Sequence, residues 1–350
     1  MKVGLIDVDG HHFPNLALMK LSAYHKGRGD EVEWWWSDFI HYDVVYMSKV
    51  FSGAYTPDVP EPLNADKVIK GGTGYAISLI NGREVYDKGK DPPLREEVER
   101  CFPDYTIYPQ FNFAVSITSR GCPRGCGFCH VAEKEGRASV RVGSVWDYWG
   151  GQKKIQVLDP NITACREKRE LFRQYRETGA RVMFNQGLDI RLTNEDDVND
   201  LNNMKLESLH FAWDDPQVDL SERFRWFSKK YVGPKRNLTE VFILTNYEDC
   251  TVEEHIERVL YRVYKLQECD NEYNPYVMIY DKPHADKRLR RLQRWCNNKY
   301  IYRSCPRFED YDPRRGGRVT MKRDDDWVIY IVTLLVWIMF TLLVATSQSK

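Results

Sequence analysis

The sequence predicts an α/β protein with parallel strands: a small doubly wound domain, then a partial (β/α)6 TIM-type barrel, and finally a C-terminal transmembrane helix. Three observations lead to this prediction. Short apolar runs alternate with helical patterns along most of the chain, which is typical of βαβ units. Three cysteines lie close together in a glycine-rich stretch directly after one of these runs. An uncharged apolar stretch lies near the C-terminus.

The length and composition of the chain limit the classes of protein to which it can belong. A chain of 350 residues has room for about two domains. Basic and acidic residues balance at 51 each, so no global field draws the protein to nucleic acid or to another charged surface. The nine cysteines lack the dense, regular spacing of a disulfide scaffold, which indicates free thiols in a reducing cytosol.

Residues 1–105 form the first predicted domain. Strands and one early helix alternate there, as in a doubly wound sheet, and ligands bind such sheets at the carboxyl ends of the strands. The segment Asp9-Gly10-His11-His12 falls at such an end. We read the charged stretch 81–103 as the linker to the next domain. The expected strands are 2–8, 31–36, 42–47 and 67–69, and the expected helix is 15–26.

Residues 106–305 form the second predicted domain, in which six apolar runs are separated by turn or helix patterns. A complete barrel would need eight such units, so six predict a partial barrel. Thr251 followed by Glu254 predicts the start of the last helix, because this pair forms a capping box. The apolar runs are 113–117, 154–158, 182–184, 208–212, 241–245 and 276–280, and the helical segments are 166–178, 194–204, 220–231 and 252–267.

Polar residues follow most of these runs. In a barrel the functional groups sit at the carboxyl ends of the strands, so these side chains are the candidates for a binding site. They are Asp159, Asn161, Asn185, Gln186, Asp189, Arg191, Trp213, Asp214, Asp215, Thr245, Asn246 and Asp281.

The cysteine stretch has the spacing CxxxCxxC, with Cys122, Cys126 and Cys129. Thiolates are soft ligands that select zinc, copper(I) or iron–sulfur clusters. A structural zinc site needs four closed ligands, whereas three cysteines within eight residues indicate a cluster with one iron left open. A zinc knuckle completed by His130, or unrelated core cysteines, are the alternatives.

This motif, with Phe128 before the last cysteine and the apolar run 113–117 ahead of it, resembles the signature of the radical S-adenosylmethionine (SAM) enzymes. The resemblance implies that three thiolates bind a 4Fe-4S cluster whose fourth iron is chelated by SAM. It also implies cleavage of SAM to a 5′-deoxyadenosyl radical that abstracts hydrogen from a substrate. A reductant protein of the flavodoxin or ferredoxin type is the implied partner.

The resemblance also suggests contacts for SAM. The backbone around Phe128 is expected to approach the adenine, and Gln186 and Asp214 are the expected polar contacts. Two segments depart from the family pattern: Leu-Asp-Pro-Asn at 158–161 replaces a Gly-Gly-Glu-like motif, and 244–249 lacks the glycines found in several members. No residue stands out as an acid, base or radical-quenching group, so the catalytic residues stay unassigned.

The first domain resembles the cobalamin-binding domain that precedes the catalytic core in one large radical SAM class. That domain carries the signature DxHxxG, and Asp9–Pro14 matches it except that Pro14 replaces the final glycine. The Gly71-Gly72 pair sits near the expected position of a later element. One interpretation makes His11 a cobalt ligand. We favour a degenerate domain that kept the fold, and we do not expect cobalamin to bind.

The stretch 327–346 contains no charged residue and has the length needed to cross a bilayer as a helix. Trp327 and Tyr330 are suited to an interface, and Lys and Arg residues in the charged linker 306–326 place the catalytic domain on the cytoplasmic side. We therefore expect a single-pass C-terminal membrane anchor. A buried core helix is the alternative.

Together these features predict a radical SAM enzyme with an unidentified substrate. A tRNA substrate is one option, because 286–295 is a basic helical stretch that could contact RNA. Cobalamin-dependent methyl transfer and action on a lipid or envelope precursor are others. The alternative from a different class is a membrane-tethered, non-enzymatic iron–sulfur or zinc-binding module.

Overall fold

The computed structural model describes residues 1–233, 239–269 and 272–315. The chain separates into one compact unit from Met1 to Gln293 and a second that starts at Arg294. The expected membrane anchor, 327–346, lies outside the described residues. Within the described residues, no helix has both the length and the apolar character needed to cross a membrane.

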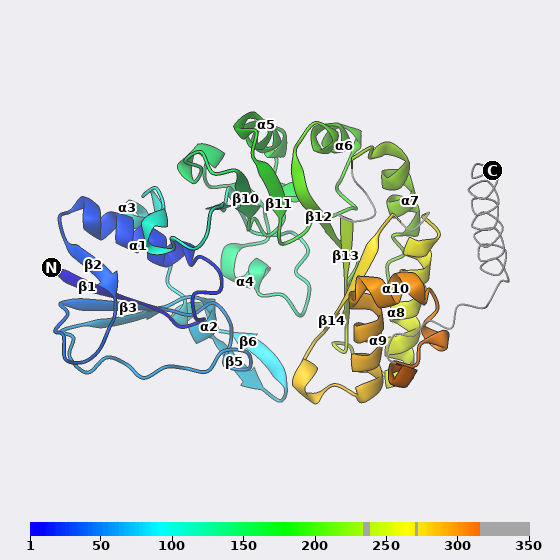
Figure 1. Cartoon of the computed structure of the whole chain (residues 1–350), viewed down its shortest axis with the longest axis horizontal. Helices are drawn as coiled ribbons and strands as arrows, with labels where there is room; N and C mark the ends of the chain where they lie inside the picture. Colours follow the sequence, from blue (N-terminus) through cyan, green and yellow to red (C-terminus); the bar gives the residue numbers. More distant parts are fainter. Residues whose placement is uncertain (234–238, 270–271, 316–350) are drawn as a thin grey trace, which may run out of the picture. The chain divides into compact units, whose positions relative to one another are not determined.

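A four-stranded sheet forms the N-terminal part of the first unit (Figure 1). All its neighbouring strands are parallel, in the order β2-β1-β3-β4. Helix α1 (Leu16–Gly27) packs on the sheet through Leu18 and Leu21, and Asn15 caps the helix by accepting a hydrogen bond from the Leu18 amide. The strands are β1 (Lys2–Asp7), β2 (Glu31–Trp34), β3 (Val44–Ser48) and β4 (Val68–Gly71).

A six-stranded sheet forms the rest of the first unit, and its parallel strands follow one another in chain order. The expected α/β fold with parallel sheets is therefore confirmed. The strands are β7 (Ala114–Ser116), β10 (Lys154–Val157), β11 (Arg181–Phe184), β12 (Leu206–Ala212), β13 (Thr239–Thr245) and β14 (Asn274–Ile279).

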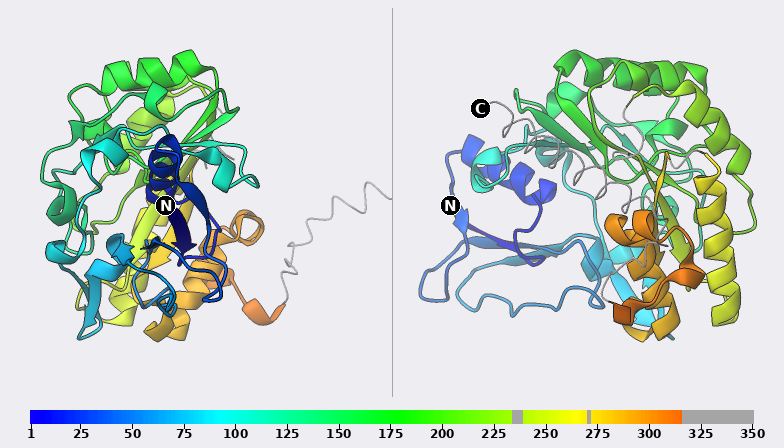
Figure 2. Two further views of the ribbon diagram at one scale, coloured as in Figure 1. Left: turned by 90° about the vertical axis from the view of Figure 1, so that its left-hand side faces the viewer. Right: turned by 45° about the vertical axis from the view of Figure 1, so that its right-hand side comes forward.

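Helices connect these strands and cover one face of the sheet (Figures 1 and 2). Helix α5 shows why: its Phe172 and Tyr175 are buried against Phe184 of β11, and it ends at Gly179 in the left-handed conformation. The predicted capping box at Thr251 and Glu254 is present at the start of α8. The connecting helices are α5 (Lys168–Thr178), α6 (Glu195–Asn202), α7 (Ser221–Lys230) and α8 (Val252–Gln267).

The stretch expected to be a loop-like linker contains regular structure instead. An antiparallel hairpin pairs β5 with β6 and turns at Asn81-Gly82, where both residues have positive φ. This dipeptide is the preferred sequence of a two-residue type I′ turn, a signal that our sequence reading missed. The remaining short elements are α2 (Thr73–Ala76), β5 (Ile77–Ile80), β6 (Arg83–Tyr86), α3 (Glu96–Glu99), β8 (Ser119–Arg120), α4 (Val131–Glu135) and β9 (Val140–Arg141).

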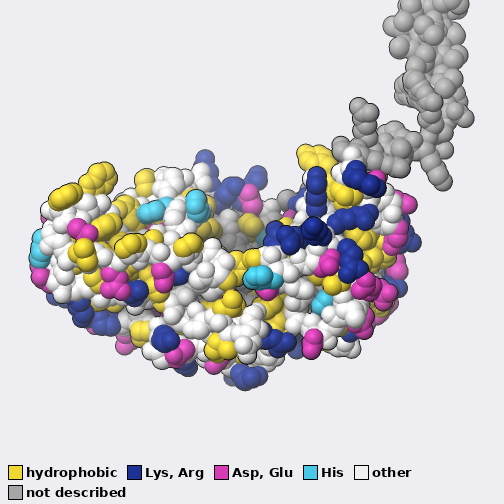
Figure 3. All heavy atoms as spheres, turned by 90° about the horizontal axis from the view of Figure 1, so that it is seen from below, with side chains coloured by type: hydrophobic (Ala, Val, Ile, Leu, Met, Phe, Trp, Pro, Cys, Tyr) yellow, Lys and Arg dark blue, Asp and Glu magenta, His cyan; other side chains and the backbone are white. Residues whose placement is uncertain are grey.

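The basic stretch at 286–295 is helical, as expected. Helix α9 (Lys287–Asn297) crosses the boundary between the two units, and α10 (Lys299–Ser304) follows in the second. On the face drawn in Figure 3, Lys and Arg side chains gather towards the right-hand side, while both signs of charge mix elsewhere. A nucleic-acid partner for this helix stays a prediction.

Candidate functional site

The cysteine loop runs from Gly121 to the start of α4, and backbone geometry fixes its first residues. Gly121 has φ +89°, and a Cβ at this position would lie 2.2 Å from the Ala138 carbonyl oxygen, so only glycine fits. The Cys122 amide donates to the Gly136 carbonyl at 3.1 Å, and the Gly121 amide donates to Glu135 Oε2 at 3.1 Å. The loop is thus held by the end of α4 that it leads into.

Arg120, directly before the loop, forms two ion pairs. Its Nη1 lies 3.1 Å from Glu135 Oε1 and its Nη2 lies 3.0 Å from Glu99 Oε1. Glu99 ends α3, on the segment that leads from the N-terminal sheet. One guanidinium therefore connects the cysteine loop both to its own helix and to the first part of the chain.

The three motif cysteines are free thiols, and they share one electrostatic environment with two strand-end residues. Burial raises the pKa of the Cys126 thiol, and the nearby Cys129, Asp214 and Cys122 raise it further, while Arg191 lowers it. Two expected strand-end residues, Asp214 and Arg191, are thus near enough to affect the charge of the Cys126 thiol.

The three cysteine sulfurs do not form a compact group of donor atoms among the described residues. In tetrahedral zinc sites with Zn–S bonds of about 2.3 Å, the sulfurs lie roughly 4 Å apart. Among the described residues, the three-ligand group whose donor atoms lie within 4.8 Å of one another does not include these cysteines. In a 4Fe-4S cluster each thiolate binds a different iron, which requires wider spacing. His130, the candidate fourth zinc ligand, lies with Nε2 3.5 Å from Glu84 Oε2 and stacks on Tyr86.

Asn161 reaches the first cysteine from the segment after β10. Its Nδ2 donates to Cys122 Sγ at 3.4 Å, and Thr163 Oγ1 donates to its Oδ1 at 2.7 Å. Because the threonine hydroxyl occupies the amide oxygen, the amide nitrogen points at the sulfur. An N–H donor at this position stabilises negative charge on the thiolate.

Asp159 supports the chain just before the cysteine loop. Its carboxylate accepts hydrogen bonds from the amides and hydroxyls of both Thr118 and Ser119, at 2.5–2.8 Å. The side chain is buried; burial raises its pKa to about 6, although the four hydrogen bonds oppose the shift. The segment 158–161 thus supplies two contacts. Asp159 binds the chain that enters the cysteine loop, and Asn161 donates to Cys122.

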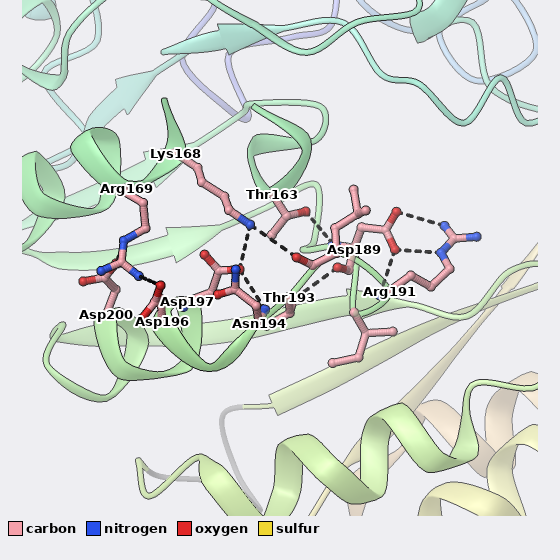
Figure 4. A network of polar contacts seen from close by, with 12 residues as sticks. Thr163, Lys168, Arg169, Asp189, Arg191, Thr193, Asn194, Asp196, Asp197 and Asp200 are labelled. Atoms are coloured by element: carbon pink, nitrogen blue, oxygen red, sulfur yellow. Dashed lines mark hydrogen bonds and ion pairs between the residues drawn. The ribbon is translucent and has the colours of Figure 1, made fainter. Parts of the chain in front are cut away.

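Asp189 joins the segment after β11 to the cysteine loop. Its carboxylate is buried and meets Arg191 Nε at 2.7 Å on Oδ1 and Arg124 Nε at 2.6 Å on Oδ2. Burial raises the pKa of Asp189, but the two arginines outweigh burial and the net shift is downward. In Figure 4 the guanidinium of Arg191 donates to both carboxylate oxygens of Asp189, and the network continues through Thr193 towards α6.

An aromatic group surrounds the last part of the loop. The Phe128 ring meets the Tyr247 ring edge-on at 5.5 Å, and Tyr247 meets Tyr280 at 5.1 Å. The Arg83 guanidinium lies 5.3 Å from the Tyr247 ring centre, and a Cβ on Gly127 would lie 2.6 Å from the Tyr247 hydroxyl. Our sequence reading missed Tyr247. The available signal was its place directly after Asn246, at the end of a strand.

The two remaining candidates for SAM contacts have different surroundings. Asp214 is partly buried, loss of solvent contact raises its pKa to about 6, and the Leu244 amide donates to its Oδ1 at 3.0 Å. Gln186 is exposed after the end of β11. Asp214 is thus the one with an electrostatic link to the cysteines.

The β5–β6 hairpin connects the site to both sheets. The Glu84 amide donates to the Tyr280 hydroxyl at 3.0 Å, and the Glu84 carboxylate accepts a hydrogen bond from Ser52 Oγ. Ser52 lies in the loop after β3, and Tyr280 follows β14. Through Glu84 the hairpin therefore contacts the N-terminal sheet, the six-stranded sheet and, at His130, the cysteine loop.

Comparison with known proteins gives a fold match but no sequence match. No family model matches the chain, and no curated protein matches it in sequence. A solved structure of the radical S-adenosylmethionine methyltransferase TsrM from Kitasatospora setae, with cobalamin and a [4Fe-4S] cluster bound, is similar, with a TM-score of 0.54 and 12% identity. The match covers 79% of this chain and 74% of that one. Residues 106–350 alone would not reach that share of this chain, so the match extends into residues 1–105.

This match corrects our expectation that cobalamin does not bind. The similar structure contains cobalamin, so the fold as a whole is compatible with it, and the expectation was wrong. The expectation rested on one replaced glycine in a signature motif, and a single residue says little about the rest of a binding pocket. In this chain His11 and His12 are exposed beyond the carboxyl end of β1.

Proposed function

We propose that this protein is a radical SAM enzyme whose Cys122, Cys126 and Cys129 hold a 4Fe-4S cluster. The supporting observation is a CxxxCxxC loop fixed beside the carboxyl ends of six parallel strands, with an amide donor on the first cysteine. A cluster held by these residues would supply one electron to SAM, whose carbon–sulfur bond would break to give methionine and a 5′-deoxyadenosyl radical. The six-stranded sheet is, in this proposal, the partial (β/α)6 barrel of that family.

The surrounding residues have distinct roles in this proposal. Asn161 holds Cys122 and stabilises its charge, while Asp159 positions the chain that enters the loop. Asp214 binds a polar group of SAM, and the backbone around Phe128 receives the adenine beside Tyr247. Asp159 and Asn161 are buried, whereas Phe128, Asp214 and Tyr247 are partly buried and line the side open to a ligand.

Partner and location follow from the same proposal. A flavodoxin- or ferredoxin-type protein supplies the electron, and 327–346 anchors the enzyme in a membrane with its catalytic part in the cytoplasm. The substrate is unidentified, and tRNA or a lipid precursor are its candidate classes.

The direct test is reductive cleavage of SAM by the full chain. After anaerobic reconstitution we expect about four irons per chain, and after reduction with SAM we expect 5′-deoxyadenosine. Cys122→Ala, Cys126→Ala and Cys129→Ala should each lose both, whereas Cys101→Ala should keep both. Zinc in place of iron with no 5′-deoxyadenosine would exclude the enzyme, and a stable cluster without cleavage would favour the non-enzymatic module.

Cobalamin-dependent methyl transfer is the second candidate function. It is favoured by the match to a methyltransferase structure that contains cobalamin, and by the exposed His11 at the end of β1. Full-length protein incubated with hydroxocobalamin and desalted should then retain about one cobalamin per chain. His11→Ala, compared with His41→Ala as the control, tests whether that histidine contributes. No retained cobalamin would exclude this function and leave SAM cleavage untouched.

A further inference from the structure

A second group of metal-binding side chains lies in the connection between β13 and α8. Glu248, Cys250 and His255 each offer a ligand atom, and these atoms lie within 4.8 Å of one another among the described residues. Cys250 Sγ is 3.4 Å from His255 Nδ1 and 3.5 Å from Nε2. Glu248 Oε2 is 4.0 Å from His255 Nδ1.

These distances are close to those of a zinc site. Tetrahedral coordination with ordinary bond lengths places a thiolate sulfur about 3.5 Å from an imidazole nitrogen, and a carboxylate oxygen about 3.4 Å from it. The distance from the sulfur to either ring nitrogen is of this size, but the near-equal distances to both nitrogens place the sulfur over the face of the ring. The carboxylate has to move by roughly half an ångström, and a turn of the imidazole ring about its Cβ–Cγ bond aims one nitrogen at the metal. Glu248 is partly exposed and has room for that movement.

The backbone holds the ligands in place. Cys250 directly precedes Thr251, the N-cap of α8, and the His255 amide donates to the Thr251 carbonyl at 3.0 Å. The capping box adds reciprocal bonds between Thr251 and Glu254. Because the cap fixes the first turn, Cys250 and His255 are positioned before any metal arrives, which lowers the entropic cost of binding.

The neighbouring groups leave the ligands available. Glu254 is engaged in the cap, and Arg258 forms only a long ion pair with Glu248, with Nη1 3.9 Å from Oε2, beyond hydrogen-bond length. His255 is buried, and the main-chain carbonyl of Glu248 faces its ring. In zinc sites a carbonyl commonly orients a histidine by accepting a hydrogen bond from the nitrogen that does not bind the metal.

We propose that Glu248, Cys250 and His255 bind one zinc ion, with water as the fourth ligand. The ion fixes the segment that carries Tyr247, whose ring contacts Phe128 and whose hydroxyl lies against Gly127. Its role is to position this part of the wall around the cysteine loop. The site does not depend on the cluster or on SAM chemistry.

The test uses the full chain carrying C122A, C126A and C129A, so that neither a cluster nor zinc at the motif interferes. After loading with Zn²⁺ and desalting, we expect about one zinc per chain by elemental analysis. With Co²⁺ as the probe we expect a thiolate-to-metal absorption band in the near ultraviolet. In competition with a chromophoric chelator, C250S and H255Q should each weaken zinc binding at least about tenfold, and E248Q by a smaller factor.

Matched variants make the result decisive. C101S removes a thiol elsewhere and should leave affinity and the cobalt band unchanged. H255C keeps a zinc ligand at the same position and should retain the metal where H255Q loses it, even if H255Q disturbs the helix. Absence of bound zinc in the parent protein, or affinity unchanged in both C250S and H255Q, would overturn the proposal. Neither outcome affects the proposed SAM chemistry, which is tested separately by SAM cleavage.

Discussion

Two residues of the segment after β10 serve the cysteine loop in different ways. Asp159 accepts four hydrogen bonds from the chain that enters the loop, and Asn161 donates to Cys122. The sequence predicts that both lie at the carboxyl end of a strand. It does not predict their partners, because strand spacing gives the edge of the sheet but not the direction of a side chain.

Replacing Asn161 by alanine should lower the reduction potential of the proposed cluster. The reduced cluster carries more negative charge, so losing an N–H donor worth about 1–2 kcal/mol lowers a one-electron potential by about 40–90 mV. A redox titration followed by electron paramagnetic resonance measures the shift. Asn185→Ala, at the end of the next strand, is the control and should leave the potential unchanged. An unaltered potential in Asn161→Ala would contradict the role assigned to this amide.

Asp159 should make stability depend on pH. Its pKa of about 6 lies above the ordinary value of 3.8, so the folded protein holds this proton more tightly than the unfolded chain does. Stability contributed by the protonated carboxyl is therefore lost as pH rises from about 4 to about 6. The free energy of unfolding of the unmodified protein minus that of Asp159→Asn should fall by about 1 kcal/mol between about pH 5 and about pH 7. Urea unfolding at the two pH values measures it, and a constant difference would refute the shift.

At the scale of elements, one helix side chain joins the carboxyl ends of two neighbouring strands. Arg262 of α8 is buried and donates to the carbonyls of Trp213 and Asp214 after β12 and of Leu244 in β13. Burial lowers its pKa to about 10, which leaves it charged at neutral pH. The helix therefore sets the separation of two strand ends beside the site.

Arg262→Met should destabilise the protein by about 3 kcal/mol or more, because it leaves several buried carbonyls without a donor. Arg262→Lys should lose less, since the ammonium keeps the charge but cannot span the same carbonyls. Arg173→Met, which removes exposed ion pairs on α5, is the matched control and should change stability little. Equal losses in Arg262→Met and Arg173→Met, measured by urea unfolding, would show that the buried contacts add nothing.

At the scale of the whole molecule, Met1–Gln293 forms one compact unit although it contains both the four-stranded and the six-stranded sheet. Contacts near the cysteine loop bridge these parts. Arg120 meets Glu99, Lys134 lies 2.9 Å from Asp91, and the Tyr108 hydroxyl donates to Asp7 at 2.7 Å. The N-terminal region is thereby attached to the loop as well as to the chain that follows it.

A double-mutant cycle should reveal this attachment. Arg120→Ala and Glu99→Ala, alone and together, should show a coupling free energy of about 0.5–1 kcal/mol in unfolding, since both side chains are about one-third exposed and solvent weakens the pair. The more exposed pair Arg95 and Glu97 is the control, and its coupling should be near zero. Coupling no larger than that of the control would mean that the ion pair does not join the two parts energetically.

The sequence by itself determined the parallel α/β fold and the glycine-rich CxxxCxxC segment after a strand, because apolar periodicity and covalent spacing are local properties. The tertiary structure alone decided which distant groups meet. It placed Asn161 on Cys122, Arg124 on Asp189, Tyr247 against Phe128 and the Asn81-Gly82 hairpin beside Tyr280. These contacts join residues tens to hundreds of positions apart. Strand order, register and side-chain direction bring them together, and none of these is written in the spacing of residues along one segment.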